Sequence, residues 1–462
     1  MSDLDHVGAW LEERVPQLLE KYGVPSAAWA VLHDGEVVDG AAGVLHLGTG
    51  VTSTPDSIYQ IGSITKLWTS SLVMQLVDEG LVELDATVRT YVPDFVLSDE
   101  QAAASITVRQ LLNHTAGFEG DIFTDTGVGD DCLEKYVATL AEVPQLFEPG
   151  EQFSYNNAGY CVLGRLVEVV RDTSYDQALR EHLVEPLGLQ HTAVSVQEAI
   201  THRVAMGHIE TSPDEGLQPA PFWSMARSNA PAGTLLSMRP RDLLEFARLH
   251  LSDGRNADGD QVLASGTPAR MQSREVDLPE LGLMGSSWGL GFERFDTEDG
   301  AIIGHDGSTV GQGAFLRMVP ETGTAVALLT NGGDVFGLYH DVVGHVLDEL
   351  AGRALPTLPQ PPSSPESIDA SRFAGTYSTE LYDLTVSQDD DGRIWIEQVP
   401  KGVFVEMGGQ VERKELVAYR DDMLIPLEAD RGMFMPHAFV GDDGDGRARY
   451  LHLGRAVRRA DA

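Results

Sequence analysis

A proline-rich segment near the C-terminus constrains the fold of this 462-residue chain more than any other feature. Residues 354–367 read ALPTLPQPPSSPES and contain five prolines. Proline lacks a backbone N–H and has a fixed φ angle, so neither a helix nor a central strand continues through such a run. We therefore expect an extended linker that separates residues 1–353 from residues 368–462.

The region before the linker has strand patterns near both of its ends and helical patterns between them. Apolar residues at helical spacing predict helices at the N-terminus, over residues 64–79 and over residues 336–352. Strand patterns occupy residues 26–43 and residues 288–331. Because these strands lie far apart in the sequence, we expect an α/β (α+β) domain whose single sheet is assembled from distant segments around a helical insertion.

The region after the linker has a different pattern. Short strand-like runs such as RIWIEQV and ELVAYRD alternate there with turns rich in Asp and Gly. Many short strands at close spacing are typical of small antiparallel barrels and sandwiches. Residues 368–462 are therefore predicted to form an all-β domain.

Charge and motif content exclude several classes of function. Lys and Arg total 32 against 71 Asp and Glu, a net charge of −39, which disfavours binding to nucleic acids or anionic membranes. Two cysteines, Cys132 and Cys161, allow at most one disulfide. The chain has no run of about 18 apolar residues, no secretory signal pattern, and no metal or nucleotide motif. We expect a cytoplasmic protein that needs no cofactor.

One segment, Gln60-Ile61-Gly62-Ser63-Ile64-Thr65-Lys66, brings a hydroxyl and an amine together. Residues at i and i+3 share one face of a helix, so Ser63 and Lys66 can touch in the first helical turn. A serine hydroxyl is a weak nucleophile, and a lysine activates it when burial lowers the lysine pKa. Amides at the helix terminus beside Ser63 could also stabilise an oxyanion. The alternative is a capping serine next to a solvated lysine.

Two further segments are candidates for supporting roles. In SYNNAGY, a phenol at Tyr155 could relay a proton and an amide at Asn157 could orient a lysine or a substrate. Taken alone, the segment favours the simpler explanation, a turn tyrosine followed by capping asparagines. The tripeptide His305-Asp306-Gly307 precedes Ser308 on a predicted strand. It is a weak signal because His33-Asp34-Gly35 repeats it, but a glycine on a strand would let a substrate approach the backbone closely.

Two other patterns have simpler explanations. Gly285-Ser286-Ser287-Trp288-Gly289 matches the nucleophile elbow G-x-S-x-G, but that motif needs a buried strand before it and a helix after it, and neither is predicted here. The six arginines between Arg431 and Arg459 stand out in so acidic a chain. They indicate either a solvated face of the β-domain or a patch that faces an acidic substrate group.

Taken together, these motifs resemble the serine β-lactamase and penicillin-binding-protein superfamily, especially its class C-like branch. The resemblance covers roughly residues 15–350 and includes the flanking phrases VTSTPDSIYQIGSITK, ITVRQLLNHTAGF, PGEQFSYNNAGYCVLG and APAGTLLS. It implies a transpeptidase-like fold in which a sheet flanked by helices meets a helical subdomain at the active site. The proline linker and terminal β-domain resemble the lipocalin-like barrel appended to some members.

The resemblance also implies a role for each site residue. Ser63 would be the acylated nucleophile and Lys66 its base, with Tyr155 and Asn157 as the relay pair. The backbone N–H groups of Ser63 and Ser308 would form the oxyanion hole. His305 stands where many members carry the lysine of a Lys-Thr-Gly motif, and a histidine is not a permanent cation at neutral pH. Histidine at this place is similar to esterases, D-aminopeptidase-like enzymes and penicillin-binding-protein-type thioesterases.

Among these, the chain is most similar to the thioesterases, which are stand-alone cyclases in nonribosomal peptide (antibiotic) biosynthesis. That similarity implies head-to-tail macrocyclisation of a peptidyl thioester with a D-configured C-terminal residue, delivered by a carrier-protein domain of a peptide synthetase. The alternative within the same machinery is a cytosolic esterase, amidase or D-aminopeptidase that hydrolyses its substrate. A non-catalytic binding or sensor module on the same fold is the third possibility.

Overall fold

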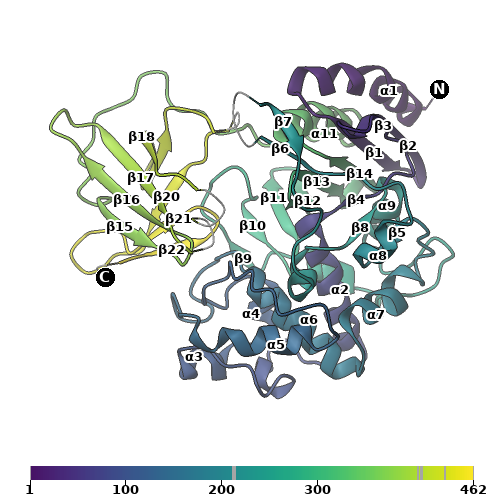
Figure 1. The fold of residues 1–462 in the computed structure, drawn as a ribbon, viewed down its shortest axis with the longest axis horizontal. Helices are drawn as coiled ribbons and strands as arrows, with labels where there is room; N and C mark the ends of the chain where they lie inside the picture. The colour runs from purple at the N-terminus through teal and green to yellow at the C-terminus, as the bar shows by residue number, and fades with distance from the viewer. Residues whose placement is uncertain (1, 211–214, 403–404, 406–408, 431–432, 461–462) are drawn as a thin grey trace.

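The computed structural model describes residues 2–210, 215–402, 405, 409–430 and 433–460. A larger α/β region contains a central sheet, and a separate barrel lies beside it (Figure 1). This arrangement confirms the predicted α/β domain with a helical subdomain and a C-terminal all-β barrel. Among the described residues, no helix is both long enough and apolar enough to span a bilayer.

The central sheet is antiparallel and has nine strands in the order β3-β2-β1-β14-β13-β12-β11-β10-β9. Its centre joins the two ends of the domain, because β1 pairs with β14 in the register Ala28↔Leu329. The prediction of one sheet built from distant segments is therefore confirmed. The strands are β1 (Ser26–His33), β2 (Glu36–His46), β3 (Val51–Thr52), β9 (Val276–Asp277), β10 (Ser287–Trp288), β11 (Glu293–Thr297), β12 (Gly300–Thr309), β13 (Gln312–Val319) and β14 (Thr324–Thr330).

Side chains alternate across this sheet and serve two separate cores. Trp29 and Val31 of β1 pack with the helices α1 (Asp3–Tyr22) and α11 (Val335–Ala351) on one face. Ala28 and Ala30 pack with α2 (Thr65–Asp78) and α9 (Pro240–Leu251) on the other face. The strand that carries His305, β12, pairs with the fully buried β13 on one side and with β11 on the other.

The helical subdomain and its connections lie on the α2 side of the sheet (Figure 1). The phrase VRQLLNHTAGF is helical only over Val108–Leu112. The remaining helices are α3 (Glu100–Ser105), α4 (Val108–Leu112), α5 (Cys132–Thr139), α6 (Asn157–Arg171), α7 (Tyr175–Leu179), a π-helical turn (Arg180–Val184), α8 (Val196–Ala199) and α10 (Thr267–Gln272). The 3-10 turns are η1 (Gly62–Ile64), η2 (Val88–Thr90), η3 (Leu140–Glu142), η5 (Arg227–Ala232) and η6 (Pro320–Thr322), and the small strands are β4 (Tyr59–Gln60), β5 (Thr192–Ala193), β6 (His208–Glu210), β7 (Leu217–Pro219) and β8 (Ser237–Met238).

The C-terminal region is a closed barrel in which eight strands pair in sequence order, β15 to β22, and β22 pairs back with β15. Its interior is a separate apolar cluster that includes Tyr377, Leu424 and Phe439. No helix or strand lies between Ala351 and Gly375, the stretch that contains the proline run. The strands are β15 (Gly375–Ser378), β16 (Tyr382–Gln388), β17 (Ile394–Pro400), β18 (Glu412–Arg420), β19 (Met423–Pro426), β20 (His437–Val440), β21 (Tyr450–His452) and β22 (Ala456–Arg459).

Candidate active site

Ser63 and Lys66 lie at the entry to the most buried helix beneath the sheet. Ser63 is in the 3-10 turn η1, which immediately precedes α2, rather than in the first turn of α2 itself. Its side chain is half-buried. Lys66 is in the first turn of α2 and has no exposed surface. Because η1 runs directly into α2, the i and i+3 spacing still places both side chains on one face, with Lys66 Nζ 3.1 Å from Ser63 Oγ.

The other neighbours of Lys66 decide what its amine can do. Nζ lies 2.7 Å from Asn157 Oδ1 and 2.7 Å from the backbone carbonyl oxygen of Ala232. Both of these oxygens can only accept hydrogen bonds. A neutral amine has two N–H groups and one lone pair, so donation to both carbonyls leaves the lone pair for the Ser63 hydroxyl. The geometry therefore suits Lys66 as a base toward Ser63.

Burial makes that neutral amine available near neutral pH. Desolvation lowers the pKa of Lys66 from its usual value near 10.5 to about 7. Nearby charges make smaller contributions: the Arg455 guanidinium lowers the pKa and the Asp121 carboxylate raises it. The alternative reading of Lys66 as a solvated surface lysine is wrong, since the side chain is fully buried.

Tyr155 and Asn157 reach the same point from the start of α6. Asn157 is the first residue of α6, and Asn156 caps that helix by accepting a hydrogen bond from the N–H of Gly159. The ring of Tyr155 lies 4.8 Å from Lys66 Nζ. Burial raises the pKa of Tyr155 well above its usual value, and a hydrogen bond with Ser63 partly offsets that rise. Tyr155 is therefore a protonated phenol that can donate and accept in a relay.

His305 projects from β12 onto the same side as Tyr155, with ring centroids 6.1 Å apart. Its Nδ1 lies 2.5 Å from the carbonyl oxygen of Asp306, so Nδ1 carries the proton. Burial lowers the pKa of His305 to about 3, which keeps the ring neutral. Its Nε2 is then a buried acceptor without a partner in the structure, available to a phenol or an attacking amine.

The backbone of Ser308 lies close to the turn that carries Ser63, and glycines at positions 62 and 307 allow this approach. A Cβ added to Gly62, whose φ is +53°, would lie 2.5 Å from the backbone nitrogen of Ser308. A Cβ added to Gly307 would collide with the carbonyl oxygen of Ile61. Gly307 therefore lets β12 approach the segment at Ile61 and Gly62, while its expected role toward a substrate stays a prediction. The Ser63 and Ser308 N–H groups stay the predicted oxyanion donors.

The two remaining sequence patterns are also resolved. The G-x-S-x-G match has only the two-residue strand β10 at Ser287–Trp288, without a following helix, and its Trp288 packs 5.4 Å from the His305 ring. The C-terminal arginines do not form one solvated face: Arg459 is inside the barrel, whereas Arg455 pairs with Asp121 of the other domain. Arg431 lies outside the described residues.

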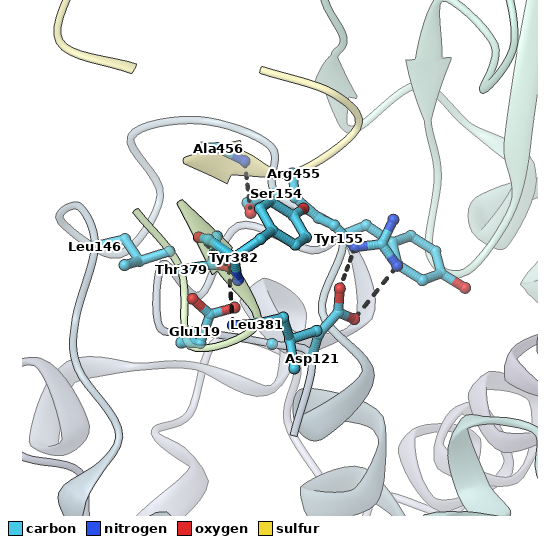
Figure 2. A pocket seen from close by; sticks show the side chains of 11 residues that line it. Glu119, Asp121, Leu146, Ser154, Tyr155, Thr379, Leu381, Tyr382, Arg455 and Ala456 are labelled. Atoms are coloured by element: carbon cyan, nitrogen blue, oxygen red, sulfur yellow. Dashed lines mark hydrogen bonds and ion pairs between the residues drawn. The ribbon is translucent and has the colours of Figure 1, made fainter. Parts of the chain in front are cut away.

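Three groups at the site were not singled out from the sequence. The carbonyl of Ala232 has no side-chain signal, although it lies in the phrase APAGTLLS. Asp121 is one of 71 acidic residues, and Arg455 was noted only as part of an arginine-rich stretch. Figure 2 shows Arg455 extending across Tyr155 toward Asp121. Within the described part of the chain, no group of three or more His, Cys, Asp or Glu residues is arranged to hold a metal ion.

Comparison with known proteins places this geometry in context. The sequence profile of the β-lactamase family matches residues 11–342. Penicillin-binding protein 4 of Amycolatopsis lactamdurans is 42% identical over 379 residues, which is 81% of this chain and 98% of that protein. The aligned length exceeds the 332 residues (11–342) that the family profile covers.

Solved structures agree. The crystal structure of SurE with D-Leu superposes with a TM-score of 0.80 at 29% identity, covering 99% of both chains. The D-amino acid amidase of Ochrobactrum anthropi SV3, in complex with L-phenylalanine amide, has a TM-score of 0.63 at 24% identity and covers 76% of this chain and 99% of that chain. The amidase likeness shows the shared fold alone.

Proposed function

The chain belongs to the β-lactamase family, within the superfamily of serine β-lactamases and penicillin-binding proteins, and on this premise we propose that it is a peptide cyclase that acts through an acyl-enzyme on Ser63. The observation that carries the proposal is the environment of Lys66. Two carbonyl acceptors occupy its N–H groups and its remaining position lies 3.1 Å from Ser63 Oγ. This is the arrangement that a serine needs in order to be activated by a lysine.

In the first step, neutral Lys66 takes the proton of Ser63 while Oγ attacks the carbonyl carbon of a peptidyl thioester. The backbone N–H groups of Ser63 and Ser308 hold the oxyanion, and removing one such donor costs about 3–4 kcal/mol of transition-state stabilisation in comparable enzymes. The C–S bond then breaks, and the leaving thiolate receives the proton from Lys66 through Tyr155. The products are the peptidyl-Ser63 ester and a free thiol.

In the second step, the peptide's own N-terminal amine attacks the ester. Tyr155, with the free Nε2 of His305 nearby, takes a proton from that amine as the C–N bond forms and passes its own proton to neutral Lys66, which returns it to Ser63 Oγ. The C–O bond to Ser63 then breaks, and Ser63 regains its proton. Ring closure competes with hydrolysis only if the amine is held in place, because water is present at about 55 M.

The position of the barrel supports cyclisation over hydrolysis. SurE matches this chain over 99% of its length, barrel included. The turn between β21 and β22 of the barrel contacts the segment that carries Tyr155, since Tyr155 N donates to the carbonyl of Gly454 at 3.0 Å. A barrel that covers this side of the site would exclude water. The D-Leu in the SurE structure is in keeping with a D-configured C-terminal residue in the substrate.

A panel of peptidyl thioesters ending in D- or L-residues tests the proposal, with Ser63→Ala as the control. We expect products lighter than the hydrolysed acid by one water, formed from substrates with a D-residue at the C-terminus. If only the linear acid appears, the enzyme is the hydrolytic esterase or D-aminopeptidase considered above. Turnover that survives Ser63→Ala would disprove the nucleophile, and no acylation by any probe would favour the binding-module alternative.

The thioester carrier is a further part of the proposal. A cytoplasmic carrier-protein domain of a peptide synthetase would present the peptide, so the carrier-bound peptide should react with a higher kcat/KM than the same peptide on a small thiol. Equal kcat/KM values for the two donors would count against delivery by a carrier protein.

A further inference from the structure

A chain of polar contacts links the barrel to the base of the active site. Arg455 Nε, in the turn between β21 and β22, lies 2.5 Å from Asp121 Oδ2. The other oxygen of Asp121 accepts a hydrogen bond from Asn157 Nδ2 at 2.7 Å. Asn157 Oδ1 in turn accepts from Lys66 Nζ at 2.7 Å. Three contacts therefore connect a barrel guanidinium to the lysine that activates Ser63. Figure 2 shows the first of them, between Arg455 and Asp121.

The donor and acceptor pattern along this chain has one consistent arrangement. Lys66 donates to Asn157, so the amide of Asn157 must present its oxygen to Lys66 and its NH2 group to the opposite side. On that side stands Asp121, whose ionised carboxylate can only accept. With the amide reversed, NH2 would face the lysine and the oxygen would face the carboxylate, and both contacts would be lost. Asp121 therefore fixes the orientation of Asn157.

Arg455 has two contacts that hold it in this place. Its guanidinium pairs with Asp121 and lies 4.9 Å from the centre of the Tyr155 ring. The Asp121 side chain is 15% exposed, so an unpaired charge there would be partly desolvated. Pairing with Arg455 gives the Asp121 carboxylate a partner of opposite charge and holds it where it accepts from Asn157. The barrel thus supplies the positive charge of Arg455, which pairs with Asp121 of the larger domain.

We propose that Asp121 and Arg455 are positioning residues of the Ser63–Lys66 centre, and that the barrel is through Arg455 a working part of the active site. The inference rests on the proposed function in one respect, the role of Lys66 as the base. It goes beyond that function because it gives two residues outside the catalytic motifs a measurable influence on the base.

The two charges should act on Lys66 in opposite directions. The groups around Lys66 are the rings of Tyr155 and Tyr160, the Cys161 thiol, the neutral imidazoles of His114 and His305, and the Asp121–Arg455 pair. Asp121 raises the Lys66 pKa and Arg455 lowers it. Neutralising Asp121 should therefore lower the Lys66 pKa, and neutralising Arg455 should raise it. A purely structural role predicts no such opposition.

The test follows Ser63 labelling by a fluorophosphonate probe as a function of pH in full-length protein. We expect Asp121→Asn to move the midpoint of the rate profile to lower pH and Arg455→Gln to move it to higher pH, each by about half a pH unit or more. Both variants should also lose about tenfold or more of the plateau rate, because Asn157 is no longer held. Arg455→Lys keeps the charge and should return the midpoint toward that of the wild type.

A matched control removes a different ion pair between the barrel and the larger domain. Arg420 Nη1 lies 3.0 Å from Glu280 Oε2, with both side chains largely exposed, so Arg420→Gln should leave the midpoint unchanged. Shifts in the same direction, or unmoved midpoints, in folded Asp121→Asn and Arg455→Gln would overturn the inference while leaving labelling of Ser63 intact. If Asp121→Asn does not fold, the contrast between Arg455→Gln and Arg455→Lys decides. Wild-type protein that is never labelled overturns the proposed function, and this inference with it.

Discussion

Lysine side chains are almost never fully buried, because removing an ammonium group from water is expensive. Lys66 has no exposed surface and is surrounded by aromatic rings and carbonyl groups. The chain therefore accepts a local loss of stability at this position. The same desolvation gives the amine a pKa near the pH at which it must act, so the burial that costs stability also makes Lys66 an effective base.

The pH dependence of acylation follows from this state. Only neutral Lys66 can accept the proton of Ser63, so the labelling rate should be low in acid, rise as pH increases through about 7, and then level off. His305, with a pKa of about 3, and Tyr155, with a pKa raised well above its usual value, add no transition between pH 5 and about 9. Stopped-flow labelling with a fluorophosphonate measures the profile. A midpoint near 10 would mean that Lys66 is not desolvated.

A second prediction concerns the contact between η1 and β12. Gly62→Ala places a methyl group against the backbone of Ser308, which cannot move aside as a flexible side chain could. We expect the labelling rate of Ser63 to fall about 10²–10³-fold, because one oxyanion donor is displaced. Gly50→Ala is the control: its φ of +66° is similar, but no atom lies within 4 Å of the added Cβ. Equal losses in both variants would attribute the effect to backbone strain alone.

At the scale of elements, the turn between β21 and β22 forms hydrogen bonds with the backbone of the segment before α6 and holds it in place; we call this contact the template. Tyr155 N donates to the Gly454 carbonyl, and Ala456 N donates to Ser154 Oγ at 3.1 Å. His452 Nε2 donates to the carbonyl of Phe153 at 2.8 Å, and its Nδ1 accepts from Gly454 N. These bonds fix the backbone on which Tyr155 is presented to Ser63.

His452→Phe tests this template. The substitution leaves the Phe153 carbonyl and the Gly454 N–H unpaired in a buried place, so the free energy of unfolding should drop by about 2–4 kcal/mol. The labelling rate should fall as well, because the segment that carries Tyr155 is released. Urea denaturation and Ser63 labelling at 15 °C would measure the two effects.

The matched control for that prediction is His437→Phe. His437 is also a neutral barrel histidine, its pKa is lowered by burial to about 4, and its Nδ1 contacts the carbonyl of Met435 within the barrel. We expect this variant to lose stability without a change in the labelling rate of the folded protein. A rate loss in both variants would show that barrel stability, rather than the template, controls the site.

At the scale of the whole molecule, two hydrophobic cores in the sheet domain and a third in the barrel are joined by a polar interface. Side chains that cross it include the pairs Arg455–Asp121, Arg420–Glu280 and Arg449–Glu151. A small apolar cluster of Phe147, Tyr450 and Ala456 lies between the domains. The linker therefore tethers two units that also hold each other through specific contacts.

Cutting the linker tests whether the contacts between the two domains hold them together without the covalent connection. We expect protein with a protease site inserted between Ser363 and Ser364, both exposed, to remain one particle after cleavage and to keep its labelling rate within about twofold. Size-exclusion chromatography and Ser63 labelling before and after cleavage measure this. Release of the barrel with retained labelling would contradict the role given to Arg455. Release with loss of labelling would show that the interface needs the tether.

Much of the fold and part of the site follow from local patterns. Ser63 and Lys66 are found from sequence because a helix places residues three apart on one face, whatever surrounds it. The sheet is found because apolar runs at both ends of the domain need partners. Asp121 and Arg455 are 334 residues apart, and no spacing rule connects them. Gly307 is found from sequence, but its contact with the carbonyl of Ile61 is not, because that carbonyl approaches it only in the folded chain.

The sequence by itself therefore determined the two-part architecture, the family and the local geometry of the Ser-x-x-Lys turn, because these depend on covalent spacing and periodicity. Only the tertiary structure decided that Lys66 is desolvated, that its amine lies beside Ser63 Oγ and two carbonyl acceptors, and that a barrel arginine reaches Asp121 and Tyr155. Protonation states and long-range charge pairs depend on what packs around a group, and that environment is assembled from segments hundreds of residues apart.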